Sequence, residues 1–285
     1  MAKILITGTS KGIGYDASLL LARAGHHVFA TMRNPTASDL GEIAAQESLP
    51  IDIHALDVDN AESVNEVFTA AGDLDVLINN AGILSYNTVE DEDVEKFTEV
   101  MNTNFFGTLR CCKAVIPRMR ENRNGCIINV SSVAGRMVVS PGAAYHSSKH
   151  ALEGFTEALA QEVTSFGIRV HLVEPGIMDT PMATTELPTT KVDSLYPQGR
   201  RVQAIFKMAA AGEAPANLVS RKFKYLLENK VDRLRHPVGP DALTFLGLRA
   251  TLSDEGYIRL FGEPSDEKFI AMYREITGAD LTSFF

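Results

Sequence analysis

The chain has few of the residues that mark secreted and metal-binding proteins. Its 285 residues include no tryptophan and only three cysteines, Cys111, Cys112 and Cys126. Two adjacent cysteines and one distant cysteine give neither a disulfide framework nor the paired spacing of a zinc site. We therefore expect reduced, buried thiols, as in a cytosolic protein, and no bound metal ion.

Excess positive charge and long apolar runs are also missing. The 27 Lys and Arg residues are outnumbered by 36 Asp and Glu, which gives a formal net charge of -9 and argues against a nucleic-acid partner. No apolar run reaches transmembrane length, and a strand-like run follows Lys3 directly, which leaves no room for a signal peptide. These features predict a cytoplasmic protein without a membrane span.

A glycine-rich turn stands between a strand-like run and a helical pattern near the start of the chain. Residues 4–7 are mainly apolar and β-branched, residues 15–24 carry apolar side chains at helical spacing, and residues 27–31 resemble a second strand. Strand, glycine turn, helix and strand within about 30 residues form the unit that binds dinucleotides. The spacing across residues 8–14 is GxxxGxG rather than GxGxxG, and such turns also occur without a ligand.

The end of the second strand distinguishes between two dinucleotides. An NAD site needs an acid about 20 residues past the glycines to hold the ribose 2′-hydroxyl, but Thr31, Met32 and Arg33 stand there. Arg33 is suited to a bidentate pair with a 2′-phosphate, and Lys11 in the turn adds a second cation. This pattern favours NADP, although both side chains also suit an ordinary solvated surface.

Further strand-like runs follow and predict one crevice. Parallel strands place ligand contacts at their carboxyl ends, so Asp57, Asn80, Ala81 and Gly82 should face the same crevice as the glycine turn. Asn80 is equally typical of simple turns. The remaining strand-like runs cover residues 51–58, 75–82, 125–130, 169–173 and 233–239.

The middle of the chain predicts a long helix with one unusual member. The acidic residues 90–95 suit the exposed first turn of a helix, where negative charge is favourable, and the apolar pattern continues to Cys112. Asn104 is a polar residue on this apolar stripe, and a buried Asn must find hydrogen-bond partners. It either bonds to a neighbouring main chain or holds a water in a site.

Tyr145 and Lys149 stand four residues apart where another helical pattern begins. On a helix they share one face, about 5–6 Å apart at Cβ. A free tyrosine has a pKa of about 10 and transfers protons poorly at neutral pH, but a nearby cation lowers that pKa. Because any helix can carry Tyr and Lys at this spacing, the pair gains meaning only from the rest of the chain.

Several motifs in one order resemble the short-chain dehydrogenase/reductase family over about residues 3–180. They are the TGxxxGxG turn from Thr7, Asn79-Asn80-Ala81-Gly82, Asn104, Ser132, Tyr145-x-x-x-Lys149, and Pro175-Gly176 with Thr180. The resemblance implies an α/β fold: a Rossmann-type doubly wound parallel sheet of about seven strands with helices on both faces. It also implies one domain over residues 1–285, a substrate lid over 181–230 and an extra helical C-terminal tail over 241–285.

The resemblance carries roles to individual residues. Tyr145 matches the catalytic acid/base, Lys149 the residue that lowers its pKa, and Ser132 the serine that binds the substrate oxygen. Asn104 matches the asparagine that holds a water in a proton relay to Lys149. The implied cofactor contacts are Gly8, Ser10, Lys11, Gly12, Ile13, Gly14, Arg33, Asp57, Val58, Asn80, Ala81, Gly82, Tyr145, Lys149, Pro175, Gly176, Met178 and Thr180.

The implied reaction is hydride transfer between NADP(H) and a carbonyl or secondary alcohol of a small to medium apolar substrate. The alternative is a non-catalytic protein that binds NADP(H) as a redox sensor. The family also implies a homodimer or homotetramer built on the helices around Phe97 and Phe155. Six apolar residues are candidates for the pocket and equally suit a plain core: Leu84, Tyr86, Val138, Val139, Met178 and Met182.

Overall fold

A parallel sheet forms the centre of the computed structural model, which describes residues 1–184, 195–212 and 214–285. Seven strands in these ranges lie in the order β3-β2-β1-β4-β5-β6-β7. Successive strands are added on one side of β1 as far as β3, and from β4 on they are added on its other side. This confirms the predicted doubly wound α/β fold, whose ligand crevice lies at that change of side. The strands are β1 (Lys3–Thr7), β2 (His27–Met32), β3 (Ile51–Ala55), β4 (Val76–Asn79), β5 (Gly125–Val130), β6 (Ile168–Pro175) and β7 (Arg235–Val238).

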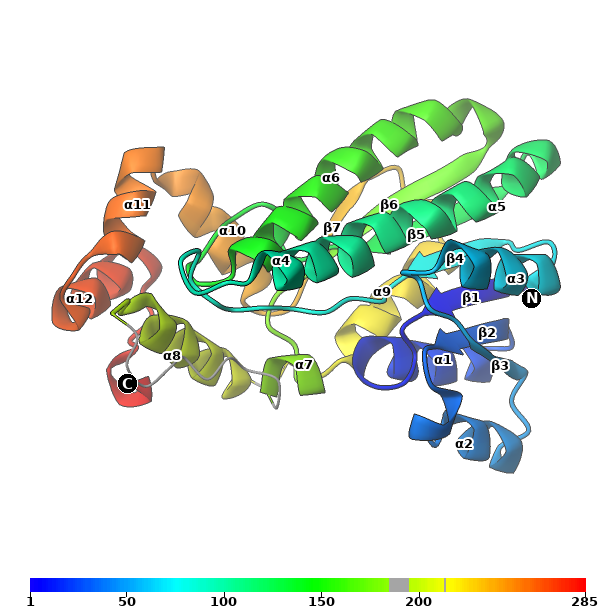
Figure 1. Cartoon of the computed structure of the whole chain (residues 1–285), viewed down its shortest axis with the longest axis horizontal. Coiled ribbons are helices and arrows are strands. Elements are labelled where there is room, and N and C mark those ends of the chain that lie inside the picture. Colours follow the sequence, from blue (N-terminus) through cyan, green and yellow to red (C-terminus); the bar gives the residue numbers. More distant parts are fainter. Residues whose placement is uncertain (185–194, 213) are drawn as a thin grey trace.

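Helices cover both faces of the sheet (Figure 1). α1 and α9 pack on one face, and α3, α5 and α6 pack on the other. No helix in the described ranges is long and apolar enough to cross a membrane. The helices before the tail are α1 (Gly12–Arg23), α2 (Leu40–Gln46), α3 (Ala61–Ala71), α4 (Val94–Met101), α5 (Thr108–Asn122), α6 (Ala143–Val163), α7 (Pro181–Thr184), α8 (Gln198–Ala210) and α9 (Asn217–Glu228).

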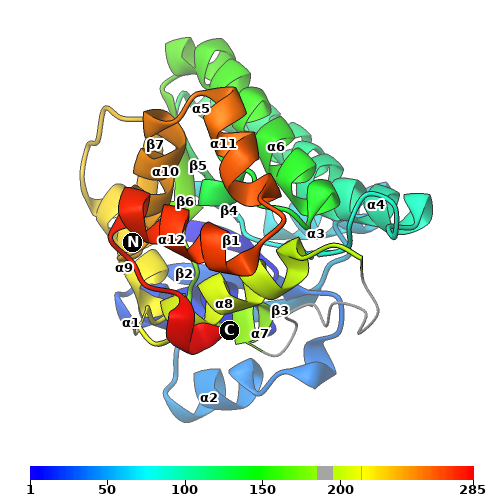
Figure 2. The same ribbon diagram turned by 90° about the vertical axis from the view of Figure 1, so that its left-hand side faces the viewer.

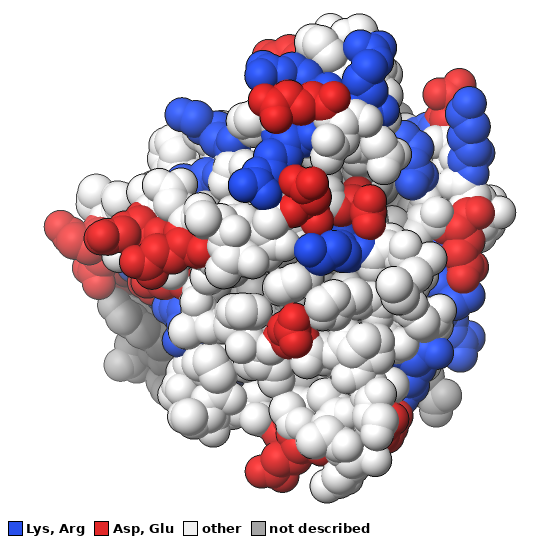
Figure 3. Space-filling model, turned by 90° about the vertical axis from the view of Figure 1, so that its right-hand side faces the viewer, with Lys and Arg blue, Asp and Glu red and all other residues white. Residues whose placement is uncertain are grey.

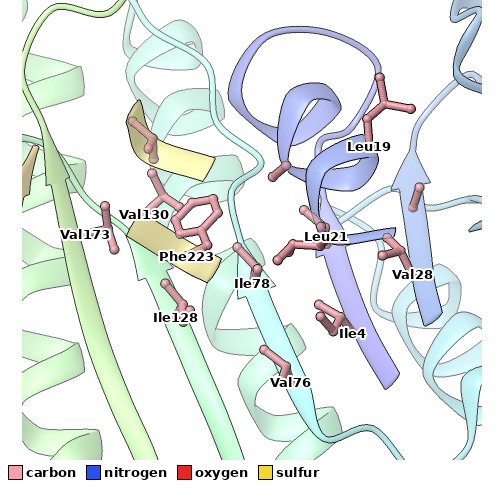
Figure 4. Close-up of a cluster of buried hydrophobic side chains, with 14 of the residues drawn as sticks. Ile4, Leu19, Leu21, Val28, Val76, Ile78, Ile128, Val130, Val173 and Phe223 are labelled. Carbon is pink, nitrogen blue, oxygen red and sulfur yellow. The ribbon is translucent and has the colours of Figure 1, made fainter. Parts of the chain in front are cut away.

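Alternation along the strands divides the core between the two faces. In β1, Ile4 and Ile6 face α1 and α9, whereas Leu5 faces the opposite helix layer. Figure 4 shows the first of these layers, where strand side chains meet Leu21 of α1 and Phe223 of α9. Each such buried aliphatic or aromatic side chain contributes roughly 1.5–3 kcal/mol. Because both faces of the sheet are packed in this way, the carboxyl ends of the strands and the loops that follow them are held in fixed positions.

The C-terminal tail packs around an apolar core that it shares with α8 and with the segment after β5. It consists of α10 (Ala242–Thr251), α11 (Asp254–Gly262) and α12 (Asp266–Thr277), which lie beside α8 at one end of the molecule (Figure 2). Leu260 and Phe269 are fully buried there, together with Ile205 of α8. The predicted helical tail is thus confirmed. The predicted lid over 181–230 includes residues 185–194 and 213, which lie outside the described residues.

Charges of both signs mix at the opposite end of the molecule. Figure 3 views this end and shows Lys and Arg interspersed with Asp and Glu, around a broad uncharged area. Nucleic-acid-binding proteins instead gather positive charge on one face. Two surface ion pairs illustrate this mixing of charges: Arg23 with Glu47, and Arg118 with Asp73.

The predicted long helix from residue 90 differs from the structure in two ways. Residues 90–93 precede α4 and overlap a turn at 89–91, where Thr88 Oγ1 donates to Asp91 Oδ2 at 2.7 Å. Glu95 is therefore the acidic residue in the first turn of α4. A π-helical segment, Asn102–Gly107, then separates α4 from α5. The side-chain hydrogen bond explains the first difference, because it gives the acidic stretch a stable non-helical conformation.

Candidate active site

A cavity of about 740 Å³ lies at the carboxyl ends of the strands. Its lining combines the turn after β1, the ends of β2 to β6 and the start of α6. The structure brings together at this cavity every site residue predicted from the sequence except Gly14 and Asn104, which lie directly behind the lining. The sheet edge therefore assembles residues that are more than 170 positions apart, from Gly8 to Thr180.

The glycines of the turn are required by close backbone approaches. Gly8 has φ +71°, and a Cβ there would lie 2.7 Å from Ala81 Cα. A Cβ on Gly14 would lie 2.4 Å from Gly8 O and 2.6 Å from Asn80 Nδ2. The Asn80 amide donates to both Thr7 O and Gly8 O at 3.0 Å, which joins the ends of β1 and β4. Gly14 thus acts by allowing the turn to close against Asn80.

The N-terminus of α1 opens toward the cavity. Lys11 precedes it in an extended conformation, and no side chain caps the helix among the described residues. Gly12 and Ile13 line the cavity directly. Backbone N–H groups of the first helical turn lack partners within the helix and attract anions. This end of the cavity is therefore suited to a phosphate group.

Arg33 lies beside the glycine turn at the end of β2. Thr9 N donates to Thr31 O at 3.0 Å, which joins the turn to the residues before Arg33. The Arg33 side chain is exposed and, with Ser10 and Lys11, lines the cavity. Two cations and a hydroxyl thus border the site where the sequence predicts a 2′-phosphate.

Tyr145 and Lys149 lie on the first turns of α6 and face the cavity from one side, as their spacing predicts. Lys149 Nζ lies 5.7 Å from the centroid of the Tyr145 ring and donates to Val130 O at 2.9 Å. Lys149 is only 5% exposed, and this burial lowers its pKa to about 8, partly opposed by the negative charge of Glu153. Near neutral pH the ammonium form still predominates.

The pKa of Tyr145 moves opposite to the direction expected from the sequence. Burial raises the pKa of the phenol, and the hydrogen bond with Ser132 lowers it by less. Lys149 Nζ is held by Val130 O at 2.9 Å, and burial is the larger of the two influences on the pKa of Tyr145. A phenol that keeps its proton is suited to act as a proton donor.

Ser132 and Ser131 follow β5 but differ in their contacts. Ser132 Oγ accepts from Ala134 N at 3.1 Å and donates to Pro175 O at 3.3 Å, so its position is fixed by two segments. Ser131 Oγ is buried without a hydrogen-bond partner among the described residues. The contact with Tyr145 belongs to Ser132, the serine singled out from the sequence.

Asn104 lies in the π-helical segment and is 1% exposed. Its Oδ1 accepts from Ile83 N at 2.8 Å, and its Nδ2 donates to Ile83 O at 2.9 Å and to Ser148 Oγ at 2.9 Å. Ser148 Oγ in turn donates to Tyr145 O at 2.7 Å. The Asn104 side chain therefore bonds to a neighbouring main chain, as the first of the two alternatives has it, and the water held for a proton relay stays a prediction.

The apolar end of the cavity includes residues that the sequence did not indicate. Five of the six candidates line it, namely Leu84, Tyr86, Val139, Met178 and Met182, but Val138 is 45% exposed and does not. Val202, Ile205 and Phe206 from α8 and Phe245 from α10 complete this end. The apolar spacing along α8 marks a helix with one buried side, but no local signal shows what that side covers.

The comparisons with known proteins agree with this geometry. Residues 2–191 match the model of the short chain dehydrogenase family. The chain therefore belongs to the short-chain dehydrogenase family, whose members are oxidoreductases that bind a nicotinamide cofactor.

Two curated relatives and one solved structure illustrate the similarity. A 3-ketodihydrosphingosine reductase of Bacteroides thetaiotaomicron is 41% identical over 62% of this chain, and retinol dehydrogenase 8 of Bos taurus is 39% identical over 67% of it. The chain spans less than two thirds of each relative's length, 64% and 66% respectively. An actinorhodin polyketide ketoreductase solved with NADPH is 26% identical, with a TM-score of 0.76 over 85% of this chain and 97% of that one.

Proposed function

We propose that the protein is an NADP(H)-dependent oxidoreductase that acts on the carbonyl or secondary alcohol of an apolar substrate. The observation that carries this proposal is the meeting of Tyr145, Ser132 and Lys149 at a cavity that also contains the glycine turn. A proton donor, a hydroxyl beside it and a buried cation are the groups that carbonyl reduction requires.

The cofactor end of the cavity fits a dinucleotide phosphate. The close approach of Gly14 to Gly8 O brings the turn and the uncapped start of α1 to one position, where backbone N–H groups face the cavity. Arg33 and Lys11 supply positive charge at the end of β2 and in the turn. The actinorhodin ketoreductase was solved with NADPH, which supports the same preference in this chain.

The chain's own residues have distinct tasks in the proposed reduction. When bound, the nicotinamide supplies the hydride. The Tyr145 phenol donates its proton to the oxygen on which negative charge develops, and the Ser132 hydroxyl hydrogen-bonds to the same oxygen. Lys149, charged below a pKa of about 8, favours the phenolate that Tyr145 becomes. Alcohol oxidation reverses these steps.

The substrate end supports an apolar compound. Leu84, Met182 and Phe206 are among its lining residues, and Tyr86 supplies a second aromatic ring. The two curated relatives are named for a lipid ketone and a lipid alcohol, 3-ketodihydrosphingosine and retinol. We propose a substrate of this kind, with one reactive oxygen and an extended apolar body.

A first test compares NADPH with NADH as reductants for a panel of apolar ketones and aldehydes. We expect turnover with NADPH to exceed that with NADH, because only NADPH has a 2′-phosphate for Arg33 to bind. Preference for NADH would contradict the role of Arg33 but leave the oxidoreductase intact. Tight NADPH binding with no turnover across the panel would instead support a redox sensor.

The Tyr145→Phe variant tests the proton donor. Removing one hydroxyl should lower kcat by about 10²–10⁴-fold, the usual contribution of general acid catalysis, while NADPH affinity changes little. The matched control is Tyr86→Phe, which removes a phenol whose ring lies 6.3 Å from that of Tyr145. The control should keep kcat within severalfold, and equal turnover by the Tyr145 variant would refute the assignment.

A further inference from the structure

Helix α8 contacts both the substrate end of the cavity and the C-terminal tail. Val202, Ile205 and Phe206 line the cavity. One turn before Ile205 on the same helix face, Arg201 reaches Asp266 at the start of α12, as does its neighbour Arg200. Figures 1 and 2 both show α8 beside α12, at the end of the molecule away from the sheet core.

Arg201 is a buried polar link between α8 and the tail. It is 1% exposed, and its Nε lies 2.8 Å from Asp266 Oδ1. Its Nη1 donates to Phe261 O at 3.3 Å, and its guanidinium lies 4.7 Å from the centroid of the Phe269 ring. One guanidinium thus contacts the end of α11 and two points of α12, in a buried setting where ion pairs and cation–π contacts are strongest.

Asp266 is held between two arginines of different exposure. Arg201 is buried, whereas Arg200 Nη2 approaches Asp266 Oδ2 at 2.7 Å with 59% of its side chain exposed. Partial burial raises the pKa of Asp266, but the hydrogen bonds from both arginines outweigh it and keep the pKa below its usual value. Because ion pairs of exposed side chains usually contribute little to stability, we expect the buried Arg201 to hold this geometry more strongly than Arg200.

The position of α8 determines the space beside the proposed proton donor. Phe206 packs edge-on against Tyr86 with ring centroids 5.6 Å apart, and the Tyr86 ring lies 6.3 Å from that of Tyr145. A row of three aromatic rings therefore extends from α8 to the reacting end of the cavity. A shift of α8 would move Phe206 relative to any substrate held at Tyr145.

We propose that Arg201 is a positioning residue through which the tail fixes α8 as a wall of the substrate site, and that this wall selects an elongated apolar substrate. The inference rests on the proposed oxidoreductase function and deepens it. The tail then contributes to substrate selection through helix placement, in addition to the direct contact of Phe245 with the cavity.

The test measures reduction of straight-chain methyl ketones from butanone to decanone by NADPH. With a fixed wall, each methylene that becomes buried raises kcat/KM by up to about fourfold. The variant Arg201→Met keeps the length of the side chain but removes its charge. We expect its kcat/KM for decanone to fall about 16-fold, which corresponds to two methylenes that are no longer buried. The loss should appear as a higher KM. The kcat for butanone and the affinity for NADPH should stay within twofold.

Arg200→Met is the matched control, because it removes the exposed arginine from the same carboxylate. It should retain the wild-type dependence on chain length within twofold. An Arg201→Met variant with unchanged dependence, or with equal loss for all ketones, would overturn the proposal. If Arg201→Met does not fold, two other variants provide the test. Arg201→Lys should show a dependence of kcat/KM on chain length between those of the wild type and of a protein without the wall, and Phe206→Ala should show none. A wild-type dependence on chain length in Phe206→Ala would also overturn the proposal.

The same series separates this inference from the function on which it rests. Wild-type protein that binds NADPH but reduces none of the ketones would refute the proposed function and the inference together. Wild-type protein that reduces them all with equal kcat/KM would leave the function standing and refute only the selection by the wall.

Discussion

At the scale of single residues, Gly14 shows how little space the turn at the cofactor end leaves. The nearest atoms to an added Cβ are Gly8 O and Asn80 Nδ2, both fixed by the hydrogen bonds that join β1 and β4. Gly14→Ala should therefore displace the turn and weaken NADPH binding at least tenfold. It should also lower the free energy of unfolding by about 1–3 kcal/mol, the usual range for overpacking.

Gly154 provides the control for Gly14. It lies on α6, and no atom of the described residues comes within 4 Å of an added Cβ. Gly154→Ala should raise the free energy of unfolding by about 0.5–1 kcal/mol, since alanine favours a helix interior, and leave NADPH binding unchanged. Urea unfolding and fluorescence titration with NADPH measure both quantities, and similar behaviour of the two variants would contradict the close-approach argument.

Some properties of the site residues could be predicted from the sequence, and others depend on tertiary packing. Tyr145 and Lys149 were predictable as neighbours because a helix fixes their spacing locally. The raised pKa of Tyr145 was not, since it depends on burial by segments far along the chain. The same reason explains why Phe206 and Phe245 were missed: their apolar character is clear, but their place beside Tyr145 depends on tertiary packing.

At the scale of secondary-structure elements, hydrophobic periodicity predicted the regular parts well. The bounds expected for β5 at residues 125–130 agree with the structure, and the other strand predictions include the observed strand or most of it. The π-helical segment Asn102–Gly107 was missed because an added residue in one turn leaves the apolar pattern on both sides nearly intact. Such segments often occur at functional sites, and this one carries Asn104.

Asn104→Ala tests what this segment does. The variant removes three hydrogen bonds to Ile83 and Ser148, and leaves both backbone groups of Ile83 without these partners. We expect the amide of Ile83 to exchange with solvent at least tenfold faster and the free energy of unfolding to fall by about 1–3 kcal/mol. Hydrogen exchange measured by NMR reports the first effect and urea unfolding the second.

Asn102→Ala is the control for this element, because it removes only the bond from Arg110 Nη2, at 2.8 Å, in the same segment. Its Ile83 exchange should match that of the wild type. Unchanged exchange in Asn104→Ala would show that the π-helical segment, without the Asn104 side chain, is enough to hold Ile83.

At the scale of the whole molecule, two buried carboxylates connect the sheet with the helix of the proposed proton donor. Glu174 of β6 is 0% exposed and lies 3.5 Å from Arg136 and 3.8 Å from Arg235 of β7. Glu153 of α6 pairs with Arg235 at 2.8 Å. Burial, and then the negative charge of Glu153, raise the pKa of Glu174 to about 7, although both arginines oppose the shift.

The raised pKa makes the stability of the fold depend on pH. Folded Glu174 holds its proton up to about pH 7, whereas the unfolded chain releases it near its usual pKa of 4.5. The unfolding free energy therefore falls as pH rises from about 4.5 to 7, by about 3 kcal/mol from this group. His236 acts in the opposite direction, because burial and the neighbouring His171 lower its pKa from 6.5 to about 4. Its contribution rises with pH over about 4 to 6.5.

Glu174→Gln should separate these opposing contributions. Between about pH 4.5 and 6.5 the contributions of Glu174 and His236 oppose each other in the wild type, so the urea midpoint of Glu174→Gln should rise more steeply with pH than that of the wild type. Without Glu174, the His236 contribution remains, and the midpoint should rise with pH over the same window. The control Glu157→Gln removes an exposed carboxylate that pairs with the same Arg235 at 2.6 Å, and should follow the wild-type profile. A Glu174→Gln profile parallel to that of the wild type would mean that Glu174 is already ionised in the folded protein, stabilised fully by its two arginines.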